Sequence, residues 1–235
     1  MTNEILLIAT VVVLYGAILL WYRLFGTNGL MAFNVLATIA ANIEVLILVD
    51  AFGMEMTLGN ILFATTFLIT DILSEVEGKK TAQQAVWIGI AANLMFIIVS
   101  QSWLMYVPSA NDWAQPSITT IFSNTPRMML ASLAVYAIAQ NFDVWLYHKW
   151  WALTERHTGS HRAYLWLRNN GSTLLSQLLN TVLYTLFAFY GMYTMGTLLS
   201  IALSSYVIFI FTSLLDTPVV YLARRMKEKR SAAAQ

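Results

Sequence analysis

Apolar runs long enough to cross a lipid bilayer follow one another along most of this chain. A transmembrane helix needs about 20 mostly apolar residues, because each residue advances the helix about 1.5 Å and the hydrocarbon layer is about 30 Å thick. The breaks between the runs carry turn residues, apart from one long polar break at 108–126. We therefore expect seven membrane-spanning helices, at residues 4–25, 30–52, 57–76, 82–106, 127–151, 170–193 and 196–222.

The composition places the chain among membrane proteins. It is 58% hydrophobic and only 11% charged, whereas soluble domains are about 25% charged. The first apolar run has no basic segment before it and no small-residue cleavage site, so we interpret it as a retained helix and not a signal peptide. The expected fold class is an all-α polytopic membrane protein, a bundle of about seven transmembrane helices. Because the chain contains no cysteine, disulfides and thiolate chemistry are excluded.

The basic residues indicate how the helices are oriented. Lys and Arg concentrate in the cytoplasmic connections of membrane proteins. With seven spans, 12 of the 13 basic residues fall on one side, and Arg127 is the exception. This distribution predicts an amino terminus outside and a carboxyl terminus in the cytoplasm. Arg127 itself is interpreted either as an anchor at the outer interface or as the one basic group available to a substrate.

Two acidic residues in the third span are the first candidates for function. Asp71 and Glu75 lie four positions apart, and so project from one face of a helix. A carboxylate at the centre of a membrane helix costs about 2.5–3.5 kcal/mol on insertion, which makes its presence a functional hypothesis by default. Glu75 is also one turn closer to Lys79 and Lys80, so it is alternatively a gate or a helix-end partner for those lysines.

Polar and aromatic side chains recur at helical spacing on three of the expected helices. Lipid cannot satisfy their hydrogen bonds, so the three stripes are expected to converge on a polar cavity in the cytoplasmic half of the bilayer. Carboxylates and amides beside flat rings suit a planar heterocycle with several N–H donors, or a cationic amine. The stripes are Asn60, Phe67, Asp71 and Glu75; Ser132, Tyr136, Gln140, Asp143 and Tyr147; and Asn170, Thr173, Gln177, Asn180 and Tyr184.

Three motifs in register resemble the queuosine precursor transporters of the vitamin uptake transporter (VUT) family. The resemblance covers about residues 30–222, and Asn180 departs from it, because many relatives carry an acidic residue there. The motifs are Thr70–Glu75 followed by Gly78–Lys80; Arg127–Ser132 leading to Ala139, Gln140 and Asp143; and Asn169–Thr173 with Ser176, Gln177 and Ala188–Gly191.

The resemblance implies an importer of 7-deazaguanine bases, such as queuine and its 7-cyano and 7-aminomethyl precursors, located in the bacterial inner membrane and serving tRNA modification. It implies a core of six helices at 30–222, an additional amino-terminal helix at 1–29, and a basic cytoplasmic tail at 223–235. The expected partners are a purine-like small molecule and the lipid bilayer, and not a nucleic acid. A homodimer and a separate energising partner both stay open.

The site hypothesis joins the residues to this substrate class. A carboxylate can accept the ring N–H and the exocyclic amine of a guanine-like edge, an amide can donate to its carbonyl group, and aromatic rings can stack on the base. Asp71 is the preferred carboxylate. The complete set of predicted substrate-binding residues is Asp71, Glu75, Asp143, Gln140, Asn169, Asn170, Gln177, Asn180, Phe67, Tyr136 and Tyr184, with Arg127 as an additional candidate.

Two other classes of function were weighed. An intramembrane protease would need a Gly-x-Gly-Asp motif or a helix-borne histidine beside a serine, and neither pattern is present, so we expect no enzymatic activity. A capture subunit driven by an ATP-hydrolysing partner stays open, because this chain contains no nucleotide-binding loop of its own. His157 and His161 have the spacing of metal ligands but lie in a basic loop, so neither a metal nor another cofactor is expected.

Overall fold

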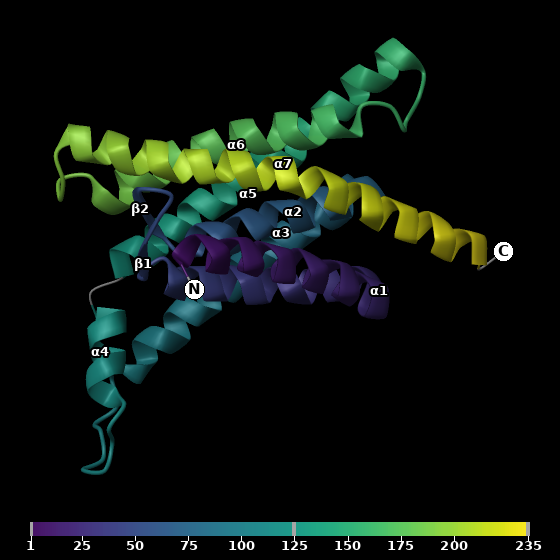
Figure 1. Cartoon of the computed structure of the whole chain (residues 1–235). Coiled ribbons are helices and arrows are strands. Elements are labelled where there is room, and N and C mark those ends of the chain that lie inside the picture. The colour runs from purple at the N-terminus through teal and green to yellow at the C-terminus, as the bar shows by residue number, and fades with distance from the viewer. Residues whose placement is uncertain (1, 124–125, 234–235) are drawn as a thin grey trace.

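Seven α-helices and one small β-hairpin make up the computed structural model, which describes residues 2–123 and 126–233 (Figure 1). The prediction of a helical protein with several membrane-length segments is confirmed, because six of these helices are long and apolar enough to span a bilayer. In chain order the elements are α1 (Asn3–Glu44), β1 (Leu48–Ala51), β2 (Met54–Thr57), α2 (Gly59–Val76), α3 (Lys79–Trp103), α4 (Gln115–Ser123), α5 (Pro126–Thr158), α6 (Leu165–Phe189) and α7 (Met195–Ala233).

Helix α1 folds back on itself at Gly26. This residue has φ 62° and ψ −143°, a conformation that glycine adopts without the steric cost of a side chain. The side chain of Asn3 donates to the carbonyl of Asp50, and the Phe52 amide donates to Glu4, so the start of α1 lies beside the hairpin that follows its end. The expected loop at 26–29 is therefore a sharp bend between two antiparallel helical halves, visible in Figure 1.

The expected second span is too long at its carboxyl end. Its helix ends at Glu44, and the following apolar residues form the antiparallel β1–β2 hairpin, in which Leu48 pairs with Thr57. Phe52 and Gly53 both have positive φ, which suits the two-residue turns that connect twisted antiparallel strands. The prediction of helix through residue 52 was wrong, because an apolar run of this length is equally compatible with a strand. Helix α4, inside the long polar break, was also not predicted.

Helix α2 is the central helix of the bundle. It packs against α1, α3, α5 and α7, and 14 of its 18 residues are buried. Helices α5 and α6 pack closely along each other, and α7 lies against α6 and α2. One end of the bundle, here called the hairpin end, carries the β-hairpin and the α6–α7 connection. The opposite tail end carries the α2–α3 and α5–α6 connections and the carboxyl-terminal part of α7 (Figure 1).

The close contact of the two α1 halves depends on Gly29. A Cβ atom at this position would lie 2.5 Å from the carbonyl oxygen of Trp21, a backbone atom that cannot move aside cheaply. We predict that Gly29→Ala separates the halves and lowers the melting temperature of the purified protein by ~2–4 °C or more, the change expected for each kcal/mol lost in a chain of this size. Gly16→Ala is the matched control, because an added Cβ there meets nothing within 4 Å. Equal melting temperatures for the two variants would contradict the prediction.

Candidate functional site

Two buried carboxylates, Asp71 on α2 and Asp143 on α5, are held by hydroxyl groups of α6. Thr173 Oγ1 donates to Asp71 Oδ2 at 2.7 Å, and Ser176 Oγ donates to Asp143 Oδ1 at 2.7 Å. Both aspartates are fully buried, and their carboxyl groups lie within reach of each other. The predicted convergence of polar stripes from three helices is therefore observed at these residues.

Helix α7 adds a third carboxylate, Asp216, to the same cluster. Its side chain is 1% exposed and interacts electrostatically with both Asp71 and Asp143. The hydroxyl of Tyr15, on the first half of α1, lies nearby but donates to the Thr212 carbonyl at 3.4 Å. Sequence reasoning missed Asp216, although the criterion that identified Asp71, an acidic residue inside an apolar run, applies to it equally.

The asparagines of α6 connect this helix to α7. Asn170 Nδ2 donates to Thr217 Oγ1 at 2.7 Å, and Asn169 Nδ2 donates to the same hydroxyl oxygen at 3.2 Å. Ser213 Oγ in turn donates to Asn170 Oδ1 at 3.2 Å. The Asn170 side chain is thereby hydrogen-bonded at both ends, whereas the side-chain oxygen of Asn169 has no partner in the part of the chain that the structure describes.

Gln140 bonds to α2. Its amide donates to Thr66 Oγ1 at 2.7 Å, and its carbonyl oxygen accepts from Thr70 Oγ1 at 3.0 Å. Both ends of this amide are therefore engaged in joining α5 to α2, one turn from Asp71 and Asp143. Gln140 is placed to position the helices that carry the two aspartates.

Several buried polar atoms at this cluster have no hydrogen-bond partner among the described residues. A buried polar group left without a partner costs about 1–3 kcal/mol, so natural proteins keep few of them unless water or a ligand completes the set. The unpartnered set contains five acceptor oxygens and one amide donor: Asp71 Oδ1, Asp143 Oδ2, Asp216 Oδ1 and Oδ2, Asn169 Oδ1 and Gln177 Nε2. The cluster can thus receive a ligand that offers several N–H donors and one acceptor.

A cavity of about 60 Å³ lies between this cluster and the hairpin end. Asn180 and Tyr184 of α6, Asn60 of α2 and Ser205 of α7 contribute to its wall. Asn180 is one helical turn from Ser176, so the cavity ends close to the carboxylates. It adjoins a wider opening of about 980 Å³ between the β-hairpin and the α6–α7 connection, and Ser205 lines both.

The aromatic side chains divide into two groups. Tyr184, one of the predicted residues, lines the cavity, and so does Phe63, which the sequence analysis did not select. The predicted residues Phe67 and Tyr136 contact the Phe63 ring, with centroid distances of 5.6 and 6.2 Å, and are not among the residues that line the cavity. Tyr136 accepts a hydrogen bond from Asn34 at 3.1 Å. Phe63 and Tyr184 are therefore the rings best placed to meet a ligand.

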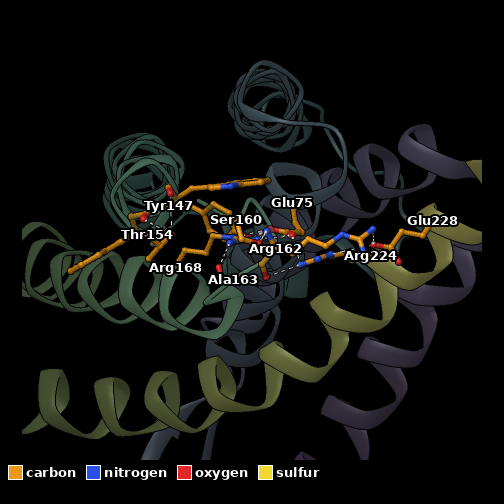
Figure 2. Close-up of polar contacts among 11 residues, drawn as sticks. Glu75, Tyr147, Thr154, Ser160, Arg162, Ala163, Arg168, Arg224 and Glu228 are labelled. Atoms are coloured by element: carbon orange, nitrogen blue, oxygen red, sulfur yellow. Dashed lines mark hydrogen bonds and ion pairs between the residues drawn. The ribbon is translucent and has the colours of Figure 1, made fainter. Parts of the chain in front are cut away.

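Glu75 has a different environment from Asp71, although both lie on α2. Arg168 of α6 holds its carboxylate in a bidentate ion pair, with Nε to Oε2 at 2.9 Å and Nη2 to Oε1 at 2.7 Å (Figure 2). Tyr147 donates to Oε2 at 2.8 Å, and Arg224 of α7 reaches Oε1 at 3.2 Å. The partners of Glu75 are thus two arginines and a tyrosine, and not the lysines considered above. We call Glu75, Tyr147, Arg168 and Arg224 the latch.

The latch is almost completely shielded from solvent. The side chains of Arg168 and Glu75 are 0% and 3% exposed, and the Arg168 guanidinium stacks on the Trp151 ring at 4.2 Å. Arg168 Nη1 also donates to the Ala163 carbonyl in the α5–α6 connection (Figure 2). Removing one partner of such a buried pair typically costs about 3–5 kcal/mol, because the other charge is left unpaired. Sequence reasoning assigned Arg168 only to the basic side of the membrane.

The comparison with known proteins decides the family. The family model described as "Putative vitamin uptake transporter" matches residues 57–223, which include the cluster, most of the cavity lining and the latch residues Glu75, Tyr147 and Arg168. The chain belongs to this vitamin uptake transporter family. It is also 39% identical over 209 residues to a protein of Bacillus subtilis (strain 168) named "Probable queuosine precursor transporter", with 89% of each chain covered. No solved structure matches the chain.

Family membership confirms the resemblance drawn from the three motifs and supports a transport role in a membrane crossed several times. Two of those motifs, Thr70–Glu75 and Asn169–Thr173, face each other across the cluster, because Thr173 bonds to Asp71. Arg127 lies apart from them: Nε and Nη2 donate to the Phe187 and Tyr190 carbonyls at the end of α6. In this transporter Arg127 caps a helix terminus at the hairpin end.

Asp216 provides a test of whether the cluster is built for a ligand. In the protein without substrate its carboxylate is buried and has no hydrogen-bond partner among residues 2–123 and 126–233, so Asp216→Asn is predicted to raise the melting temperature by ~2–4 °C while weakening transport. Thr217→Val is the comparison variant: it removes the acceptor of Asn169 and Asn170 and should lower the melting temperature. A destabilised Asp216→Asn protein would show that this carboxylate holds the structure together.

Proposed function

We propose that this chain imports 7-deazaguanine bases, the precursors of the tRNA nucleoside queuosine, across the bacterial inner membrane. The main support for this proposal is the set of unpartnered acceptor and donor atoms in the cluster, which a base could complete. The printed name of the Bacillus subtilis relative supports the same substrate class. Queuine and the 7-cyano and 7-aminomethyl bases share the edge that these atoms would recognise.

The hydrogen-bonding edge of such a base complements the unpartnered set. A guanine-like edge offers a ring N–H and an exocyclic amine as donors, and its carbonyl oxygen as an acceptor. Asp71 Oδ1 and Asp143 Oδ2 can accept the donors, as carboxylates do at base edges elsewhere, and Gln177 Nε2 can donate to the carbonyl. Asp216 is added to the proposed binding residues, with Asn169 as a further acceptor. Asn170 and Gln140 act in this proposal by positioning the helices.

The route to the cluster runs from the hairpin end. A base would enter the wide opening, stack against Tyr184 or Phe63 in the cavity, and then reach the carboxylates one turn deeper. Stacking on an aromatic ring is worth about 1–3 kcal/mol per base. The present cavity of about 60 Å³ is narrow, so the side chains around Asn180 must separate as the base passes.

In the same proposal, the tail end of the bundle faces the cytoplasm. Because α1 turns back at Gly26, its two halves can each cross the membrane, and the bundle then has seven crossings. Arg23, Lys79, Lys80 and the basic part of α7 then share the tail end, in accord with the excess of positive charge on cytoplasmic connections. The amino terminus lies outside in this orientation.

Uptake by the purified protein in liposomes tests the function directly. We predict that labelled 7-aminomethyl-7-deazaguanine accumulates to the external concentration, and that Asp71→Asn reduces the initial rate by at least ~10-fold, the effect of losing about 1.4 kcal/mol of binding. Asp112→Asn, at an exposed position before α4, is the matched control and should transport normally. Unchanged uptake by Asp71→Asn would remove Asp71 from the site. Repeating the assay with a proton gradient, or finding no uptake without a second protein, distinguishes the energetic alternatives.

Competing ligands test which edge of the base the carboxylates contact. A 7-deazaguanine analogue that lacks only the exocyclic amine leaves a buried carboxylate oxygen unpartnered, so it should compete at least ~10-fold more weakly than the parent base. The measurement is inhibition of labelled uptake across a concentration series. An analogue methylated at the opposite edge of the base serves as the size control. Equal inhibition by the parent base and the analogue that lacks the amine would mean that the carboxylates do not contact this edge.

A further inference from the structure

The latch lies one helical turn beyond the carboxylate cluster on three helices at once. Asp71 and Glu75 are four residues apart on α2, and Asp143 and Tyr147 are four apart on α5. Positions four apart share a helix face about 6 Å from each other along the axis. On α6, Ser172, which lies beside Asp143, follows Arg168 by the same interval. Cluster and latch therefore form two adjacent layers.

The two layers differ in access. The cluster adjoins a cavity that leads to the hairpin end, whereas on its tail-end side lies the latch, with two almost completely buried charges. Figure 2 shows how the latch joins helices that are distant in sequence. A ligand that leaves the cluster toward the tail end would therefore meet the layer that contains Arg168 and Glu75.

Glu75 has a second cation available. Its Oε1 atom accepts from Arg168 and also from Arg224, at 2.7 and 3.2 Å. Arg224 is 17% exposed and contacts Glu228, on the next turn of α7, at 3.5 Å. Glu75 therefore keeps a charged partner if it moves from Arg168 to Arg224, while the Arg168 guanidinium keeps its contacts with the Ala163 carbonyl and the Trp151 ring. These contacts lower the cost of opening a buried ion pair, which is high when a charge is left with no partner.

We propose that Arg168 is the gating residue of this transporter and that separation of Arg168 from Glu75 opens the tail end. The inference rests on the proposed transport function and adds to it the residue that controls release. The structure described above is the state open toward the hairpin end. Opening the latch favours the opposite state, in which the hairpin-end cavity closes, because a transported solute requires alternating access from the two ends.

The absence of cysteine from the natural chain makes this testable without any substrate. Ser172→Cys places the only thiol in the cluster layer, one turn from Arg168; the native hydroxyl is buried and donates to the Asn169 carbonyl of its own helix. Ser205→Cys places the only thiol in the hairpin-end cavity. The measurement is the rate at which a hydrophilic maleimide labels each reporter, with the latch intact and with Glu75→Gln.

The expected result is a reciprocal change. Glu75→Gln should accelerate labelling at position 172 by ~10-fold and slow it at position 205, within the 5–150-fold range typical of coupling between sites. Tyr147→Phe removes only one hydrogen bond to Glu75 and should shift both rates in the same directions by less, which preserves the test if Glu75→Gln does not fold. Glu77→Gln is the matched control: it breaks the more exposed ion pair with Lys227 at the same end and should leave both rates unchanged.

Two outcomes would overturn the proposal. Rates that rise together at both reporters would mean that the substitution loosens the bundle, and rates that stay constant would mean that the latch does not govern access. Labelling requires no transported base, so these outcomes are separate from a failure of uptake. If the labelling rates change reciprocally but the base is not taken up, the gating proposal stands and the proposed substrate class is wrong.

Discussion

The hydrocarbon core of a membrane offers no hydrogen bonds, and this constraint organises the interior of the protein. Polar side chains on α2, α5, α6 and α7 can be satisfied only by one another, by water or by a solute. Helix α6 supplies the hydroxyls that hold Asp71 and Asp143, and its asparagines reach Thr217 on α7. The bundle is thus cross-linked through its polar residues, while its apolar side chains face lipid and each other.

Asp71 and Glu75 show how differently the same residue class can be used one turn apart. Glu75 accepts hydrogen bonds from Arg168, Arg224 and Tyr147, so its charge is neutralised within the protein. Asp71 accepts one hydrogen bond from Thr173 and keeps a second oxygen unpartnered among the described residues. The first arrangement favours a closed, rigid end of the bundle. The arrangement at Asp71 leaves an oxygen free to bind a ligand but lowers the stability of the fold, as is common at functional sites.

Hydropathy predicted most of the helices because bilayer thickness sets both the length and the composition of a span. It failed where an apolar run is not helical: residues 48–51 continue the preceding pattern but form the first strand of the hairpin. The polar stripes correctly brought Asp71, Asp143 and Thr173 together. Arg168 was missed as a site residue because its partner is distant in sequence and because a basic residue near a span end resembles an ordinary topology signal. Only its ion pair with Glu75 in the folded bundle shows that it is buried.

The position of α7 has a consequence for how the protein is made. This helix leaves the ribosome after α2, α5 and α6, yet it supplies Asp216 to the cluster and Arg224 to the latch. Its distal turns then bind the other connections at the tail end, through Lys227 to Glu77 and Glu228 to Arg162. A nascent chain that ends before α7 therefore has neither the complete carboxylate cluster nor the complete latch. The synthesis of α7 is thus the step that completes both, and a product truncated before this helix lacks the parts of a working permeation path.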